Sequence, residues 1–472
     1  MKAKANRWVW IPILLCSMSM AVAAAVMPNL FPFPDPSGVV ETYTSAGSFR
    51  TSGPFFQSLG TNGRTCATCH VVSSAMGLSA AHAEQVYETS RGRDPLFSAV
   101  DGAVCPTAAR GHDLDFSLLR EKGLIRIALA MPANPQFTIA AVQDPYGCAL
   151  VTDSKTGVQT ISVYRRPLPG TNLGFLSAVM FDGRETVAPL NNKTTYAANL
   201  FADLSQQAID ATLGHAQAAT APSAAQVEGM VDFELALNSA QAINFRAGIL
   251  NSEGAEGGAK FLATVPFYPG INDSLGPPAQ FSPNAFTLYS KWQFSGDLER
   301  RSVARGEEIF NTQPLLITNV RGLNDALNQP VINGTCTTCH DTPNVGDHSL
   351  AVPLDIGTSR SAEFETDPTI LAAVSQLSMP KIPVFRVVCT EGPLAGEVTY
   401  TSDPAKAIIS GQCSDVGRGK GLILRGLAAR APYFHNGAAA TLDEVVEFYN
   451  SRFQMNLTPE QKIDLVNFLK TL

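Results

Sequence analysis

The chain has 472 residues, of which 45% are hydrophobic, 16% charged and 8% aromatic. This composition can bury more than one core, and it excludes a disordered, collagen-like or coiled-coil protein. The 37 glycines and 31 prolines favour long irregular connections. The net charge of −7 and the scattered basic residues argue against a nucleic-acid partner. A basic protein partner would be attracted instead.

The N-terminus has the three-part order of a secretory signal peptide. Lys2, Lys4 and Arg7 precede an apolar run, and three alanines follow at residues 23–25. We expect residues 1–25 to be removed and the mature protein to be exported to the periplasm without a membrane span. The alternative is an uncleaved anchor, because the apolar run is close to the ~18 residues that a spanning helix needs.

Residues 28–48 are rich in proline, serine and glycine, and they predict an extended arm over the surface. The first of two C-x-x-C-H segments follows this arm. Two thiols three positions apart can each form a thioether with a vinyl group of one haem, and the adjacent histidine can bind the iron. A zinc site would need further ligands nearby, and a thioredoxin-like pair would need a βαβ context; the sequence shows neither. The predicted haem-binding residues are Cys66, Cys69, His70, Cys336, Cys339 and His340.

Four further cysteines follow the signal peptide and belong to neither haem motif. In an oxidising compartment they can form two disulfides. Proximity in the chain favours the pairs Cys105–Cys148 and Cys389–Cys413. Buried free thiols are the alternative, because cysteine is also a common core residue.

Ser223 and Gln226 form a capping box that predicts an amphipathic helix. Prolines and glycines at residues 265–283 predict an interdomain connection. We therefore expect an N-terminal haem domain at 26–275 and a C-terminal haem domain at 290–472.

Residues 305–311 predict a helix that opens the second domain, and Thr458 with Pro459 and Gln461 predicts a terminal helix. The two haem motifs also form a weak internal repeat. The expected fold is therefore mainly α, with two cytochrome c-like haem domains and long irregular loops.

Two further segments carry a resemblance. Residues 431–437 read A-P-Y-F-H-N-G and precede a helical pattern that ends at Tyr449, while residues 181–184 read F-D-G-R. With the haem motifs, these segments resemble the bacterial dihaem cytochrome c peroxidases and their relatives that mature methylamine dehydrogenase. The longer spacing here implies insertions, within 90–175 and 240–290.

The resemblance implies two covalently bound haem c groups, with calcium as an additional candidate ion. It also implies that hydrogen peroxide reacts at the N-terminal haem. Electrons would reach the C-terminal haem from a small cytochrome c or a cupredoxin.

The helix after Thr441 carries a candidate iron ligand. Thr441 and Glu444 predict a capping box, and the apolar spacing places Tyr449 on the buried face. The corresponding position holds methionine in the peroxidases and tyrosine in the maturation enzymes. Tyr449 is therefore either a ligand of the second haem or a buried core tyrosine. Met379 and Met455 are weaker ligand candidates.

The peroxide-reacting site departs from the family. Relatives carry a glutamate in the loop after W-D-G-R, whereas this chain places His215 or Gln217 there. His215 can move a proton near neutral pH, while Gln217 can only form hydrogen bonds. His215 could alternatively bind the iron as a sixth ligand or lie on the surface. His82 and Met76 are further candidates for the distal ligand.

Phe181 stands where relatives place a tryptophan between the haems, and phenylalanine is harder to oxidise. His348 lies in a polar loop close to the second motif, and we assign it no catalytic role. The predicted function is an exported dihaem peroxidase-like oxidoreductase. Tyr449 favours the alternative of a maturation-type enzyme that oxidises a protein, whereas the missing glutamate favours a dihaem electron carrier without a substrate.

Overall fold

The computed structural model describes residues 26–106, 115–152, 154, 156–186, 196–268, 270–275, 280–348 and 352–472. The predicted signal peptide at residues 1–25 lies outside these ranges. Within them, no helix combines the length and the hydropathy needed to cross a lipid bilayer.

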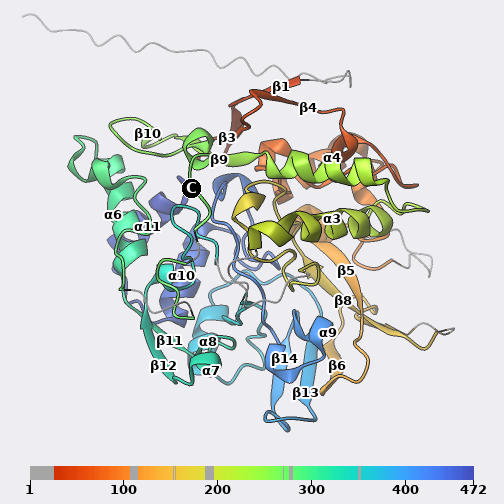
Figure 1. Ribbon diagram of the computed structural model, residues 1–472. Helices are drawn as coiled ribbons and strands as arrows, with labels where there is room; N and C mark the ends of the chain where they lie inside the picture. Colours follow the sequence, from red (N-terminus) through yellow and green to blue (C-terminus); the bar gives the residue numbers. More distant parts are fainter. Residues whose placement is uncertain are drawn as a thin grey trace, which may run out of the picture.

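The α-helices of the described residues range from single turns to the long helices α3 and α6 (Figure 1). They are α1 (Ala80–Ser90), α2 (Ser117–Lys122), α3 (Tyr196–Gly214), α4 (Ala224–Leu235), α5 (Ala259–Leu262), α6 (Leu298–Thr312), α7 (Asn324–Leu327), α8 (Pro368–Val374), α9 (Ala407–Ser410), α10 (Leu442–Arg452) and α11 (Pro459–Leu469). Short 3-10 turns lie between them, and two of these, η2 (Cys66–Thr68) and η7 (Cys336–Thr338), form the first three residues of the two C-x-x-C-H segments.

Strands form five separate small sheets within the described residues. The sheets are β1 (Val26–Pro28) with β4 (Ser48–Arg50); β10 (Gly248–Ile249), β9 (Asn238–Asn244), β3 (Gly38–Tyr43) and β2 (Phe33–Asp35); β11 (Leu315–Thr318) with β12 (Val331–Gly334); β14 (Val398–Thr401), β13 (Val384–Cys389) and β6 (Phe137–Gln143); and β5 (Ile125–Ala130), β8 (Gln159–Arg165) and β7 (Leu150–Thr152).

The expectation of a mainly α fold is therefore wrong, because helices and sheets both build the molecule. The sequence of β8, Q-T-I-S-V-Y-R, gives the physical reason. Its β-branched and aromatic side chains favour an extended strand. This strand lies within residues 90–175, where the resemblance implied an insertion. Part of the predicted arm is likewise a strand, since β3 pairs with β9.

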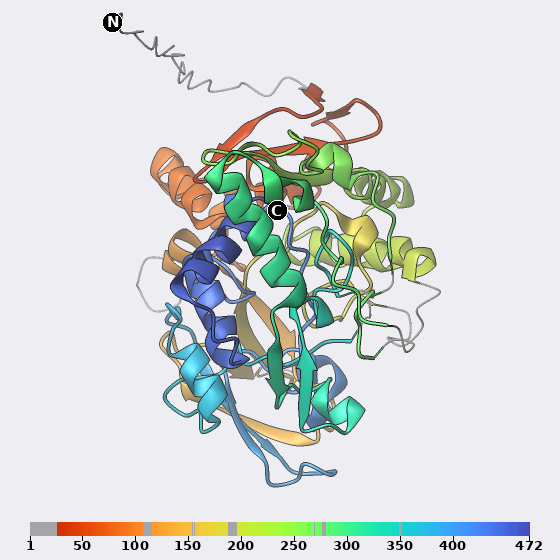
Figure 2. The same ribbon diagram turned by 90° about the vertical axis from the view of Figure 1, so that its left-hand side faces the viewer.

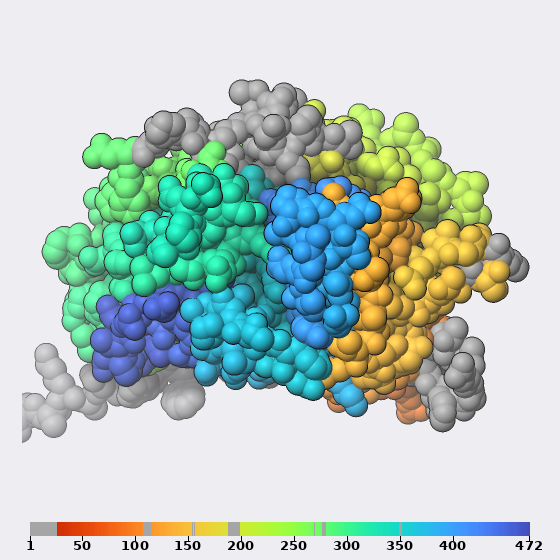
Figure 3. Space-filling model, turned by 90° about the horizontal axis from the view of Figure 1, so that it is seen from below, coloured from red at the N-terminus to blue at the C-terminus, as the bar shows by residue number. Residues whose placement is uncertain are grey.

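The sheet β14-β13-β6 joins distant parts of the chain. Strand β6 pairs antiparallel with β13, and the register sets Ile139 opposite Val387. Figure 3 shows the surface of this junction, where the blue segment around β13 lies against the orange and yellow segment around β6. The core below it includes Phe137 and Phe385, which are almost fully buried.

Helices α6 and α11 pack closely together (Figure 2). A β-carbon at Gly306 would lie 2.1 Å from the carbonyl oxygen of Asp464, so only glycine allows this approach. The Asp464 carboxylate then accepts hydrogen bonds from Ser302 at 2.6 Å and from Arg305 at 2.7 Å. These contacts hold helices α6 and α11 together.

Several local predictions are confirmed. The capping boxes at Ser223 and Thr458 open α4 and α11. The helix predicted at 305–311 lies within α6. At Thr441 only half of the predicted box forms: its side chain accepts the Glu444 N–H, but the Glu444 carboxylate accepts the Ala440 N–H instead. Both disulfides also form as predicted, with Cα–Cα distances of 6.1 Å for Cys105–Cys148 and 5.8 Å for Cys389–Cys413.

Candidate haem sites

The two C-x-x-C-H segments fold in the same way. Each is preceded by a threonine whose side chain and backbone exchange hydrogen bonds with the threonine three residues later. The turn then brings the histidine N–H onto the carbonyl of the first cysteine, at 3.0 Å for His70 and 2.9 Å for His340. The two thiols and the imidazole of each motif are thereby held on one compact turn.

Both motif histidines are fixed through the same ring nitrogen. Nδ1 of His70 lies 3.2 Å from the carbonyl oxygen of Met76, and Nδ1 of His340 lies 2.8 Å from that of Gly346. If Nδ1 carries the proton, Nε2 keeps its lone pair for iron. Burial lowers the pKa of both histidines, which favours the neutral form that binds metal.

The motif cysteines form no disulfide. Burial raises the pKa of the Cys66 thiol to about 12 and that of Cys69 to about 11. These thiols are therefore neutral near pH 7. An uncharged thioether is compatible with such an environment, whereas a thiolate that binds zinc would need a compensating charge.

The first motif opens onto a cavity of about 1670 Å³, which includes space open to solvent. Its wall contains Arg425, which is 1% exposed and whose three guanidinium nitrogens make no hydrogen bond. A buried cation without a partner is costly, and it indicates that an anionic group belongs in this cavity. A haem propionate has this charge, so the first cavity fits the group that its cysteines predict. Glu234 lies in the same wall, and burial raises its pKa to about 8.

The second motif opens onto a similar cavity of about 1730 Å³, also partly open to solvent. Apolar side chains of α10 and α11 line much of it, together with Tyr449 and Met455. The ring centroids of Tyr449 and His340 are 6.3 Å apart across the cavity wall. Burial raises the pKa of the Tyr449 hydroxyl. Arg166, Lys420 and Arg430 provide positive charge for an anionic group here as well.

One wall separates the two cavities, and we call it the partition. Its residues line both cavities and are Arg166, Pro167, Leu168, Pro169, Phe181, Lys420, Leu422 and Ile423. Phe181 thus lies between the two sites, as its position in the F-D-G-R segment implied.

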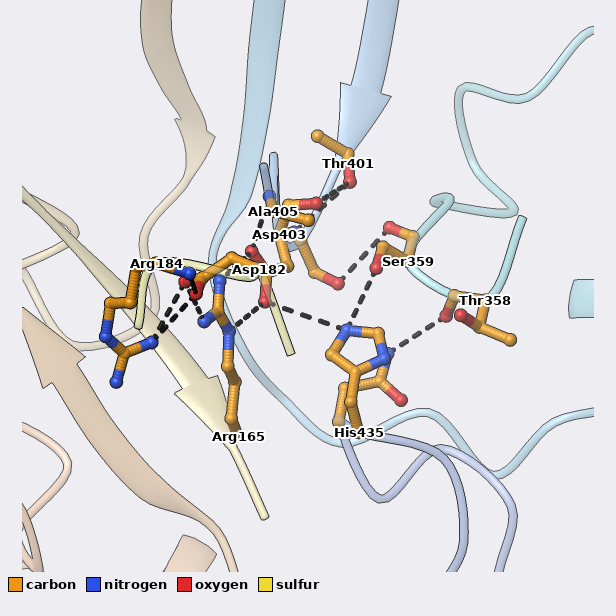
Figure 4. Close-up of polar contacts among 11 residues, drawn as sticks. Arg165, Asp182, Arg184, Thr358, Ser359, Thr401, Asp403, Ala405 and His435 are labelled. Atoms are coloured by element: carbon orange, nitrogen blue, oxygen red, sulfur yellow. Dashed lines mark hydrogen bonds and ion pairs between the residues drawn. The ribbon is translucent and has the colours of Figure 1, made fainter. Parts of the chain in front are cut away.

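A buried polar network supports the partition (Figure 4). The guanidinium of Arg165 donates to Asp403 at 2.6 Å and also pairs with Asp182. His435 lies beside this pair, with Nε2 3.1 Å from Ser359 and 3.7 Å from Asp403. Burial lowers the pKa of His435 to about 4, and the nearby Arg165 charge acts in the same direction. His435 is therefore neutral, because burial and the Arg165 charge together outweigh the opposite effect of the nearby Asp403 carboxylate.

A second polar group borders the first cavity. Nδ1 of His215 lies 2.5 Å from the Asp101 carboxylate, whose other oxygen pairs with Arg64. All three residues line the cavity. Burial alone would raise the pKa of Asp101, but the hydrogen bond with His215 and the Arg64 charge outweigh it and lower the pKa. Asp101 is thus an ionised group that orients His215.

Other predicted residues lie elsewhere. Gln217 is exposed and lies outside the lining of the first cavity. Met76 packs in a core cluster with its carbonyl toward His70, and His82 lies on α1 away from the cavity. Met379 does not line the second cavity, whereas Met455 does. Of the candidates for the first haem's distal side, only His215 lies in the cavity wall.

Sequence reasoning missed Asp101, Arg64 and Arg425. Asp101 lies far from His215 in the chain, within an irregular segment that carries no motif. The sequence offered one signal for Arg64, which stands two residues before Cys66. Arg425 could be identified only from the structure, because what marks it is a buried guanidinium that makes no hydrogen bond.

Comparison with known proteins gives partial matches to cytochrome c peroxidases. No family model matches the chain. It is 26% identical over 219 residues to the cytochrome-c peroxidase IdrP2 of Pseudomonas sp. (strain SCT), covering 40% of this chain and 53% of that protein. It is 34% identical over 102 residues to the cytochrome c551 peroxidase of Nitrosomonas europaea, covering 21% of this chain and 28% of that protein.

The chain thus spans about half the length of one curated relative and little more than a quarter of the other. These partial similarities support a relationship to bacterial cytochrome c peroxidases at the level of the family. They also support a peroxidase-like function and a haem cofactor at that level.

Proposed function

We propose that this protein is an exported dihaem c-type peroxidase. In this proposal, hydrogen peroxide takes up two electrons and two protons and yields two molecules of water at the first cavity. The electrons enter at the second cavity from a small cytochrome c or a cupredoxin. The observation that carries the proposal is the pair of cavities, each bordered by a C-x-x-C-H turn and separated by one shared partition.

The residues that would hold the first haem are Cys66 and Cys69 through thioethers and His70 through Nε2. Cys336, Cys339 and His340 would hold the second in the same way. When bound, haem c supplies a redox-active iron at each site. Arg425 would pair with an anionic edge of the first haem, which would give its buried guanidinium the partner it lacks.

His215 would move the proton that peroxide cleavage requires. Asp101 holds Nδ1, which leaves Nε2 available to take a proton from one peroxide oxygen and deliver it to the other. Arg64 keeps the Asp101 carboxylate in place through its ion pair. Gln217 receives no role in this proposal, because its side chain is exposed.

Tyr449 favours the maturation-type alternative, in which two oxidising equivalents act on another protein. Its support is the position of Tyr449 in the second cavity, near His340. Phe181 disfavours this alternative, because phenylalanine is harder to oxidise than the tryptophan of relatives. The electron-carrier alternative requires both irons to be six-coordinate, with His215 as the distal ligand of the first.

The deciding experiment compares the parent protein with His215→Ala. Both should carry two haem c groups per chain in a pyridine haemochrome assay, and the parent's ferric spectrum should respond to stoichiometric peroxide. The variant should react roughly 10²–10⁴-fold more slowly, as expected for a lost acid–base group. His82→Ala is the matched control, because His82 lies outside the cavity.

Two results would contradict the proposal. An inert parent that becomes high-spin and peroxide-reactive in His215→Ala would identify His215 as an iron ligand and support the carrier. A parent with one haem or none would remove its basis. Export is tested separately by the N-terminal sequence and mass of the protein in the periplasmic fraction.

A further inference from the structure

Three side chains outside the proposed haem ligands converge beside the second cavity. Asp273, Asp341 and His348 each offer one ligand atom, and these atoms all lie within 4.8 Å of one another. Asp341 is 0% exposed and His348 is 4% exposed. Within the described ranges, no other group of three or more His, Cys, Asp or Glu side chains brings its possible ligand atoms this close together.

The backbone around the cluster is held independently of any ligand. The N–H of Ile271 donates to the Asp341 carbonyl at 3.1 Å, and the Asn272 side chain donates to Thr337 at 2.8 Å. These bonds fasten the segment with Asp273 to the second haem turn. On the other side, the Ser177 hydroxyl donates to the His348 carbonyl at 2.9 Å. The backbone that carries the three side chains is therefore held in place.

His348 points into the cluster without a hydrogen bond. Its Nδ1 lies 3.5 Å from an Asp341 carboxylate oxygen, and this nearly inaccessible nitrogen makes no hydrogen bond. Two more buried atoms nearby, the Thr342 hydroxyl and one oxygen of Asp347, also lack a hydrogen bond. A well-packed protein leaves few such atoms, and several together indicate a missing partner.

The charge of the region favours a cation as that partner. Asp341 and Asp347 are both buried, and Asp273 adds a third carboxylate at the edge. Lys420 is the nearby ammonium group, but it donates to the Ala178 carbonyl at 2.8 Å. A divalent ion would add positive charge beside these carboxylates, which low-dielectric surroundings favour.

We propose that Asp273, Asp341 and His348 form a binding site for a divalent transition-metal ion, with Zn²⁺ as the best match. One imidazole and two carboxylates are ligands that zinc uses, and water can complete the coordination. Calcium prefers oxygen ligands only, so this site differs from the calcium expected on resemblance. The ion would fasten the segment 270–275 to the second haem turn. This inference does not depend on peroxide chemistry.

The test uses the protein with both haems attached, because the motif thiols are then thioethers and cannot bind zinc. After treatment with a chelator and desalting, Zn²⁺ or Ca²⁺ alone is titrated by calorimetry, and metal content is measured by mass spectrometry. We expect one Zn²⁺ per chain in addition to iron. Asp273→Asn, Asp341→Asn and His348→Ala should each weaken binding by ~10-fold or more.

Asp232→Asn and His82→Ala are the matched controls, because Asp232 is exposed and His82 lies on α1. Both should bind zinc as the parent does. Asp273→Asn keeps the test meaningful if Asp341→Asn disturbs the adjacent His340, and the haem spectrum reports such a disturbance. Equal zinc binding by parent and site variants would overturn the proposal. The absence of zinc binding would also overturn it, and so would a site that binds calcium but not zinc. If no metal binds, a protonated His348 would remain the partner of the carboxylates.

Discussion

The ring of Phe181 lies flat against the imidazole of His435, with centroids 4.0 Å apart and planes 10° apart. Phe181 borders both cavities, whereas His435 borders only the second. The stack is confined from the other side, because a β-carbon at Gly419 would lie 2.1 Å from the Phe181 ring. The Phe181 ring can therefore occupy its position in the partition only because residue 419 has no side chain.

Gly419→Ala should displace Phe181 from this position. The added methyl group overpacks the partition, which we expect to cost about 1–3 kcal/mol of the free energy of unfolding. The exchange of electrons between the two haems should also become slower. Urea unfolding and stopped-flow reduction would measure the two effects. Gly296→Ala is the control, since a β-carbon there has nothing within 4 Å. Identical behaviour of both variants would show that the partition tolerates a displaced ring.

Asp101→Asn should impair peroxide reduction while both haems stay attached. The variant removes the negative charge that holds His215, and it leaves the buried Arg64 without its ion-pair partner. We expect a loss of ~10²-fold or more in the peroxide reaction, together with lower stability. Single-turnover kinetics and thermal unfolding measure the two separately. If the variant is less stable but reduces peroxide at the wild-type rate, Asp101 has only a structural role. Asp232→Asn is the control for the lost charge.

Tyr449→Phe tests whether the hydroxyl contacts the second haem. The change keeps the ring and removes the oxygen, so a bound phenolate would be lost and the potential of that haem should rise. Spectroelectrochemistry of the two haems would detect this. Tyr433→Phe is a matched control, because its hydroxyl lines the same cavity but donates to the Leu427 carbonyl at 3.2 Å. An unchanged potential in Tyr449→Phe would mean that this tyrosine only packs.

His435 should make the protein less stable in mild acid. Burial lowers its pKa from 6.5 to about 4, so the unfolded chain binds a proton between these values and the folded chain does not. Stability is therefore retained above pH 6.5 and falls as the pH drops toward 4, by up to about 3 kcal/mol. Urea unfolding from pH 7.5 to 4.5 should show a shallower pH dependence for His435→Gln. Parallel curves for the two proteins would contradict the assigned cause.

Local patterns were enough to predict part of this structure. Ser223 and Thr458 mark helix starts through capping chemistry, which acts within four residues. Phe181 was expected between the haem sites because of its short motif. The sheet of β6 and β13 was not predicted, because its pairing depends on two segments that only the folded chain brings together.

The residues of the candidate site were also predicted only in part. His215 was proposed from its approximate position, but Gln217 could not be separated from it without knowing how the end of α3 turns. The two residues are neighbours in sequence, yet His215 borders the cavity and Gln217 faces outward. Asp101, which gives His215 its orientation, comes from a segment without any recognisable pattern.

The pairing of β6 with β13 limits how the two proposed haem sites can be isolated experimentally. A fragment that ends before β13 would leave one edge of β6 without its neighbour, and open edges promote aggregation. The same fragment would also lack Lys420, Leu422, Ile423 and Arg425, which belong to the wall of the first cavity. Each haem is therefore best assigned by disabling the other within the intact chain, through substitution of His70 or His340.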